Sequence, residues 1–269
     1  MREFDTDMEI ALEARSVTAG YGQQAKVIEA LCLGIKSGTF TVLAGPNGSG
    51  KSTLLKALAG FLPLTEGAVE LQGAPVSSFS AKRLAQLVGI LPQGPSAPEG
   101  LSVEDLVRQG RYPHRGLFSR WTPQDTHACR AALDLTGLAD LAERPLDSLS
   151  GGQKQRAWIA MVLAQQTPVL LLDEPTTFLD IAHQVEILSL LRRLVKENGR
   201  TVVAVLHDIN QAAQYADRLV LLKGGRVKAE GDTRSVVTGE AMDAVFGVRS
   251  QVITNPVDGT PLMLLESDL

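Results

Sequence analysis

Hydrophobic and polar residues alternate over two stretches near the start of the chain, Met8–Val17 and Val27–Ile35. A period of two is typical of strands with one buried face, so these stretches predict an antiparallel β-layer. Later apolar segments are short continuous runs, whose length suits strands buried on both faces. These runs predict strands at 39–44, 169–172 and 201–206. Two shorter segments predict strands at 68–71 and 88–91.

Helical periodicity separates these strands, and strands that alternate with helices predict a mainly parallel core sheet. The expected helices lie at 51–60, 125–136, 152–166, 181–198, 208–215 and 240–246. Ser102 and Asp105 resemble a capping box at the start of a block that is helical in pattern. Gly224-Gly225 joins a predicted hairpin of Leu219–Lys223 with Arg226–Glu230. We therefore expect an α/β domain over 8–247, with a helical subdomain of about 95–150 inserted, and a short tail over 248–269 with two weak strands.

The composition is that of an ordinary α/β protein: 269 residues, 44% hydrophobic and 21% charged, with a net charge of −4. This charge gives no general attraction to nucleic acid or anionic lipid. Met1–Asp7 has no apolar core and is not expected to be a signal peptide. No apolar run reaches the roughly 18–20 residues that cross a bilayer, so a membrane process would need another chain. Cys32 and Cys129 are expected to be reduced thiols in a cytosolic protein.

The segment Gly45–Ser52 fits the pattern G-x-x-x-x-G-K-[ST] between a predicted strand and a predicted helix. Glycines in such a loop let backbone N–H groups turn inward around phosphate, and the helix start adds a positive dipole. Lys51 is expected to reach the β- and γ-phosphates, and the Ser52 hydroxyl to bind Mg²⁺. The other expected nucleotide ligands are Gly45, Asn47, Gly48, Ser49, Gly50 and Thr53.

Two carboxylates, Asp173 and Glu174, follow the buried strand 169–172. Open α/β sheets bind ligands at the carboxyl ends of their strands, so this pair is expected beside the phosphate loop. Asp173 is predicted to assist in holding Mg²⁺, and Glu174 to act as the general base that polarises the attacking water. The predicted cofactors are ATP and Mg²⁺.

At this point the chain resembles the ATP-binding cassette family. Leu149-Ser150-Gly151-Gly152-Gln153 is similar to the signature sequence of that family, and it precedes Asp173-Glu174 by one helix and one strand. Four further positions match family motifs in the same order along the chain. They are Tyr21, Gln93, Leu179-Asp180 and His207. The resemblance spans residues 21–207 and implies an ATPase.

The resemblance also implies roles for these residues. Tyr21 would stack on the adenine, and Asp180 would belong to a loop that meets the nucleotide site. Gln93 would take part in both Mg²⁺ binding and catalysis. His207 would contact the γ-phosphate and act in hydrolysis.

The residues Ser150, Gly151, Gly152 and Gln153 are themselves a candidate anion site, because small residues at a helix start expose backbone N–H groups. One chain already has a phosphate loop at Gly45–Ser52, so the second site suggests the nucleotide of a neighbouring subunit. Two copies related by a two-fold axis would then form two composite ATP sites. The expected partner is a second ATPase subunit, in a homodimer.

Other classes of ATPase fit the sequence less well. Chromosome-maintenance cassette proteins insert a long coiled coil between the phosphate loop and the signature, and this chain has only a short gap there. Translation-type proteins carry two cassettes, and a P-loop kinase or GTPase would not need Ser150–Gln153. A transport subunit remains, and a cassette ATPase acting on nucleic acid is the alternative of another class.

The segment Arg108–Arg120 mixes basic and aromatic residues. It carries Arg108, Arg111, Tyr112, His114, Arg115, Phe118 and Arg120. The resemblance favours a groove for a permease helix, while a solvated surface and a nucleic-acid contact stay open as alternatives. The histidines His114, His127 and His183 are expected at the surface or at helix caps.

Finer resemblance concerns the cargo. Asp173–Gln184 and Gly110–His114 look like the ferric-siderophore importers, and haem and cobalamin importers are the rivals. The resemblance implies a polytopic membrane permease and, indirectly, an extracytoplasmic siderophore-binding protein, with no nucleic acid. It places the chain at the cytoplasmic face of the inner membrane as a peripheral subunit.

Overall fold

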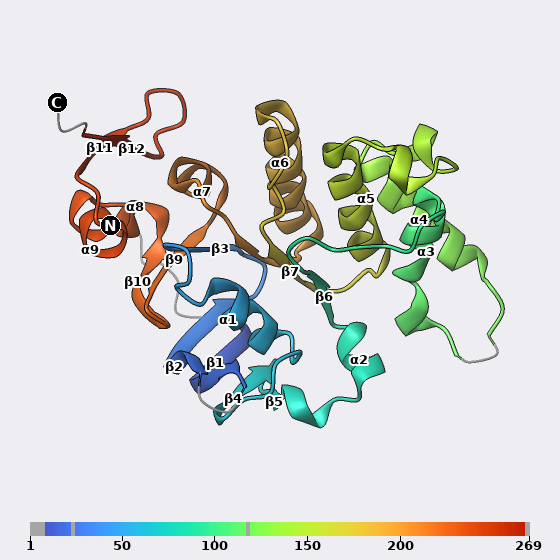
Figure 1. The fold of residues 1–269 in the computed structure, drawn as a ribbon, viewed down its shortest axis with the longest axis horizontal. Helices are drawn as coiled ribbons and strands as arrows, with labels where there is room; N and C mark the ends of the chain where they lie inside the picture. The colour runs from blue at the N-terminus through green and yellow to red at the C-terminus, as the bar shows by residue number, and fades with distance from the viewer. Residues whose placement is uncertain (1–8, 23–24, 117–118, 267–269) are drawn as a thin grey trace.

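The computed structural model describes residues 9–22, 25–116 and 119–266 and contains two main sheets with one helix between them (Figure 1). The six-stranded core sheet has the order β10-β9-β3-β8-β7-β6. Strands β9 to β6 are parallel, and β10 pairs antiparallel at one edge. Their bounds are β3 Phe40–Ala44, β6 Val88–Leu91, β7 Val169–Asp173, β8 Thr201–Val205, β9 Arg218–Lys223 and β10 Arg226–Asp232.

The continuous apolar runs are buried on both faces, as their pattern predicts. In β7, Leu170 and Leu172 pack in a cluster with α6, while Val169 and Leu171 pack in a second cluster that includes α1. Helices therefore cover both faces of the sheet. The helices are α1 Lys51–Leu58, α2 Ala81–Ala85, α3 Val103–Gln109, α4 Pro123–Leu135, α5 Gly151–Ala164, α6 Ile181–Asn198, α7 Ile209–Tyr215, α8 Thr233–Val236 and α9 Gly239–Phe246.

The predicted antiparallel layer is present as a four-stranded sheet of order β2-β1-β4-β5. Its strands are β1 Ile10–Tyr21, β2 Ala25–Lys36, β4 Glu66–Leu71 and β5 Ala74–Pro75. The predicted start at Met8 lies outside the described residues. Both long strands run further than predicted because register shifts interrupt the alternation, for example between Ala14 and Val17 of β1. Helix α1 packs between this layer and the core sheet.

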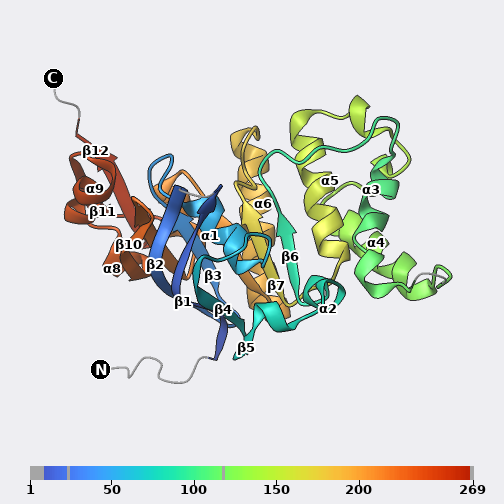
Figure 2. The same cartoon turned by 60° about the horizontal axis from the view of Figure 1, so that its bottom comes forward.

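The inserted block carries α3, α4 and the short 3₁₀ helices η2 Tyr112–His114, η3 Ala139–Leu141 and η4 Leu146–Ser148. A further 3₁₀ helix, η1 Val76–Ser78, follows β5 of the antiparallel layer. Figures 1 and 2 both place this block, with α5, at one end of the molecule. The predicted capping box is confirmed, because Ser102 accepts from Asp105 N and Asp105 accepts from Ser102 N. Helix α4 begins earlier than predicted, because Thr122 forms a second capping box with Asp125.

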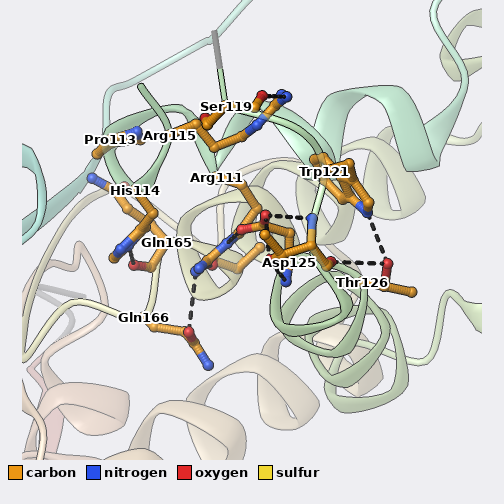
Figure 3. Close-up of polar contacts among 12 residues, drawn as sticks. Arg111, Pro113, His114, Arg115, Ser119, Trp121, Asp125, Thr126, Gln165 and Gln166 are labelled. Atoms are coloured by element: carbon orange, nitrogen blue, oxygen red, sulfur yellow. Dashed lines mark hydrogen bonds and ion pairs between the residues drawn. The ribbon is translucent and has the colours of Figure 1, made fainter. Parts of the chain in front are cut away.

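The basic segment needs a correction at Arg111, which is neither a solvated residue nor a groove residue. Its side chain is 2% exposed, and its Nε donates to Asp125 Oδ1 at 2.9 Å. It also donates to the Ala164 carbonyl and to Gln166 Oε1, so it joins α4 to the end of α5 (Figure 3). The sequence pattern grouped Arg111 with other basic residues and did not indicate its burial, because that burial depends on tertiary packing. Phe118 lies outside the described residues.

The tail forms the two expected strands, β11 Ser250–Thr254 and β12 Pro261–Leu265, paired as a hairpin. The Asn210 side chain of α7 binds both the N–H and the carbonyl of Met263 in β12, at 2.7 and 3.1 Å. In Figures 1 and 2 this hairpin lies at the end of the molecule opposite the helical block.

Candidate functional site

The phosphate loop lies between β3 and α1, where the sequence predicts it. Gly50 is the N-cap of α1 with φ of 101°, a conformation that a side chain rarely adopts. Gly45 has φ of 150°, and a Cβ on it would overlap the Leu222 carbonyl of β9. Glycine is therefore required at both positions by backbone conformation and by close packing.

Lys51 lies folded inside this loop. Its Nζ donates to the Gly45 carbonyl at 2.8 Å and to the Pro46 carbonyl at 3.0 Å. Burial lowers the pKa of Lys51, and the carboxylates of Asp173 and Glu174 oppose that shift. The side chain is thus a buried cation whose present partners are carbonyl oxygens, which an incoming phosphate can replace.

Ser52 and Asp173 meet across the site. The Ser52 hydroxyl donates to Asp173 Oδ1 at 3.0 Å. The other carboxylate oxygen, Oδ2, is buried and has no hydrogen-bond partner among the described residues. Burial raises the pKa of Asp173. A buried carboxylate oxygen without a donor, next to a hydroxyl, fits the hard oxygen ligands that Mg²⁺ takes.

Glu174 follows β7 with φ of 54°. Its Oε1 lies 2.8 Å from His207 Nε2, and its Oε2 accepts from the Thr177 hydroxyl at 3.0 Å. Burial raises the pKa of Glu174, but the hydrogen bonds from His207, Thr177 and Gln93 outweigh it and lower the pKa below its ordinary value. The carboxylate is therefore held in the charged form that a general base requires.

Several of these groups line one cavity of about 430 Å³, whereas the predicted site residues Gly45 and Asp173 are not among its lining residues. Most of its lining was singled out in the sequence: Asn47, Gly48, Ser49, Gly50, Lys51, Ser52, Thr53, Gln93, Glu174 and His207. Val27 of β2 also lines it and was missed, since a strand valine gives no chemical signal. Thr177 was missed as a contact of Glu174, although a β-turn brings residues three apart in sequence close together.

Tyr21 lies at the end of β1, half exposed, and is not among the residues that line the cavity. Its hydroxyl accepts from Lys56 Nζ at 3.4 Å, and the same ammonium lies 5.6 Å from the ring centroid. About half of the Tyr21 surface is therefore exposed to solvent, with the Lys56 ammonium over the ring.

The signature residues lie away from the cavity. Ser150 caps α5 and forms a capping box with Gln153, and a Cβ on Gly151 would meet open space. Asp180 caps α6, where it accepts from His183 N at 2.9 Å and from the His183 ring. None of Ser150, Gly151, Gly152, Gln153 or Asp180 lines the cavity within the described part of this chain.

An apolar groove of about 570 Å³ lies on another surface, between the end of α1, β4, α2 and β6. Phe61, Val69, Phe79, Leu84 and Ile90 line it, and Phe61 is 68% exposed. Ile90 of β6 lines this groove, and Gln93, two residues after the end of β6, lines the cavity. It has room for apolar side chains of another molecule.

The family model described as ABC transporter matches residues 28–177. The ferric enterobactin transport ATP-binding protein FepC of Escherichia coli is 45% identical over 96% of this chain and 95% of its own. This chain belongs to the ABC transporter family. The iron(3+)-hydroxamate import ATP-binding protein FhuC of Bacillus subtilis is 46% identical over 94% of each chain.

Two solved structures extend the comparison. One, an inward-facing metal-chelate type ABC transporter, has a TM-score of 0.82 at 32% identity and covers 97% of this chain and 98% of its own. The other is a dimeric post-hydrolysis cassette bound to ADP and Pi. It has a TM-score of 0.74 at 31% identity and covers 83% of this chain and 99% of its own. This ABC protein is therefore a transport ATPase of a family whose cassettes dimerise. In its described residues, no helix has the length and apolarity to cross a membrane.

Proposed function

We propose that this ABC ATPase drives the import of ferric siderophores through a membrane permease. The observation that carries the ATPase chemistry is the single cavity in which the phosphate loop, Gln93, Glu174 and His207 meet. The cargo is inferred from the relatives named for ferric enterobactin and iron(3+)-hydroxamate, which align over almost the whole chain. The metal-chelate type transporter supports the same class of cargo.

The proposed chemistry is in-line attack of water on the γ-phosphate of ATP. Lys51 exchanges its carbonyl partners for phosphate oxygens, and the backbone N–H groups of the loop surround the β-phosphate. Glu174 accepts the proton of the attacking water. His207 leaves Glu174 Oε1 for the γ-phosphate, where it stabilises the charge that develops.

Mg²⁺ is the proposed metal cofactor, held by Ser52 and Asp173 with Gln93 nearby. The basis is the buried, unpartnered Asp173 Oδ2 beside the Ser52 hydroxyl. When bound there, the ion would supply positive charge for the phosphates. Among the described residues no cluster of three or more His, Cys, Asp or Glu side chains could hold a metal. An ion shared between these two residues and the nucleotide is consistent with that.

The working unit is proposed to be a homodimer with two composite ATP sites. Ser150–Gln153 begins helix α5 and does not line the cavity of its own chain, and the N–H groups at this helix start are suited to phosphate. Tyr21 of the chain that binds the nucleotide would stack on adenine. Asp180 and the exposed Phe178 (87%) precede α6 on the loop proposed to meet the second copy.

The permease is proposed to dock an amphipathic cytoplasmic helix in the apolar groove of α1, β4, α2 and β6. The exposed Tyr112 lies near it, since η2 packs on α2. With this docking, the proposed location of the ATPase is the cytoplasmic face of the inner membrane. A siderophore-binding protein outside the membrane would deliver cargo to the permease without touching this chain.

The test compares wild type with Glu174→Gln. Losing the general base should slow ATP hydrolysis by roughly 10²–10⁴-fold while ATP still binds. A strain that lacks this protein should lose uptake of radiolabelled ferric siderophore, and Glu174→Gln should fail to restore it. Turnover near wild type would remove Glu174 from the mechanism. Loss of only haem or only cobalamin uptake would reassign the cargo and leave the ATPase in place.

A further inference from the structure

Besides His207 and Gln93, the carboxylate of Glu174 has a partner that no motif pointed to. The Thr177 hydroxyl donates to Oε2, while His207 lies on Oε1. The two partners therefore occupy different oxygens of one carboxylate. This matters because a general base needs one oxygen free for the proton and needs the carboxylate aimed at the water.

The two contacts differ in how the fold holds them. Thr177 and Glu174 belong to one tight turn, in which the Thr177 N–H donates to the Glu174 carbonyl at 3.2 Å. Pro175 stands at the second position of this turn, where its fixed φ favours the bend. His207 instead comes from the segment after β8. Movement of His207 therefore leaves the Thr177 contact in place.

The turn is also strained, which indicates that its geometry is maintained by its contacts. Glu174 has φ of 54° and Phe178 has φ of 65°, and neither is glycine. Residues other than glycine persist in this region only where the surroundings fix them. Hydrogen bonds from Thr177 to both the backbone and the side chain of Glu174 are part of that support.

We propose that Thr177 is a positioning residue for ATP hydrolysis. Its hydroxyl holds Oε2 of Glu174, so that Oε1, once His207 has moved to the nucleotide, faces the attacking water. Oε1 then takes the proton while the water oxygen bonds to the γ-phosphorus and the bond to the leaving ADP oxygen breaks. Thr177 itself touches neither water nor phosphate. The inference rests on the proposed role of Glu174 as the base.

The experiment measures kcat and KM for ATP in the full-length wild type and in variants of Thr177 and Thr176. Thr177→Val removes the hydroxyl at constant shape, and Thr177→Ser keeps it. Thr176→Val is the matched control, because Thr176 is also partly buried and no hydrogen bond joins its hydroxyl to Glu174 among the described residues. If Thr177→Val lowers the melting temperature of the protein, Thr177→Ala replaces it as the variant without the hydroxyl.

Thr177→Val should lower kcat about 10-fold with KM within about 2-fold, the scale of one lost hydrogen bond to a charged group. Thr177→Ser should stay within about 3-fold of wild type, and Thr176→Val should match wild type. Adding Thr177→Val to Glu174→Gln should cause no further loss, since the base is already gone.

Three results would overturn the inference. They are wild-type kcat in Thr177→Val, an equal loss in the serine variant, and a loss that appears only in KM. If instead the Glu174→Gln variant hydrolyses ATP as fast as wild type, the proposed function is refuted. Failure of the inference and failure of the proposed function therefore give different results.

Discussion

At the scale of single residues, the two cysteines give a direct test of local environment. Cys129 of α4 is 3% exposed, and burial raises the pKa of its thiol to about 11. Cys32 of β2 is exposed. Because the thiolate is the reactive form, only roughly a thousandth of Cys129 is reactive at pH 8, and packing further restricts access to it.

We therefore expect a maleimide to label one thiol per native chain at pH 8 and two after denaturation. Intact-mass spectrometry counts the labels, and Cys32→Ser should give none in the native protein. Labelling of Cys129 should speed up as pH rises toward 11, because deprotonation increases. Native labelling of Cys129 as fast as that of Cys32 would contradict the burial described here.

The sequence identified much of the candidate site because phosphate chemistry is local in sequence. Gly45–Thr53 forms one loop and the first turn of α1, so its motif already contains its geometry. The contact of His207 with Glu174 could not be predicted, since it depends on how the ends of β7 and β8 are placed side by side. Thr177 carries no motif and becomes informative only when the turn brings it to the carboxylate.

At the scale of elements, strands and helices in the core were predictable because their hydrophobic runs and caps are strong. The strand 88–91 and the helix 181–198 have their predicted bounds in β6 and α6. Less predictable was how the inserted block is fastened to the core. The Arg111 network does this with a buried ion pair, and a basic residue in a mixed segment gave no sign of burial.

Arg111→Ala should lower the free energy of unfolding by about 3–5 kcal/mol, because it leaves Asp125 buried without its cation. The control is Arg130→Ala, which breaks an exposed pair with Asp134 on the same α4 helix and should cost under about 1 kcal/mol. Urea unfolding followed by circular dichroism measures both. Equal midpoints for the two variants would show that Arg111 does not fasten the block.

The loss in free energy of unfolding caused by Arg111→Ala should also depend on pH. Burial raises the pKa of Asp125, but hydrogen bonds from Thr122 and Arg111 outweigh it and lower the pKa. A carboxyl with a lowered folded pKa stabilises the protein above its unfolded pKa, and the contribution is lost as pH falls through the folded value. The difference in free energy of unfolding between wild type and Arg111→Ala should therefore become smaller as the pH is lowered.

At the scale of the whole molecule, the separation of two anion sites argues for function in trans. Lys51 lines the cavity and Ser150 does not, so in the proposed dimer a second copy brings a signature over each phosphate loop. Ser150→Arg puts a long cation at an exposed helix start. It should abolish hydrolysis yet leave ATP binding to the monomer near wild type, because Ser150 does not line the cavity. Ser148→Arg, at another exposed serine two residues earlier, is the matched control.

Mixing Ser150→Arg with Lys51→Ala separates the trans arrangement from one within a chain. In a mixed dimer, one site has both defects, and the other has an intact phosphate loop from one chain and an intact signature from its partner. Half the dimers in an equal mixture are mixed, so hydrolysis should return to at most about a quarter of wild type if the sites act independently. If each signature served its own chain, every site in the mixture would carry one defect. Loss of ATP affinity in the Ser150→Arg monomer, measured by isothermal titration, would equally place the signature at its own nucleotide.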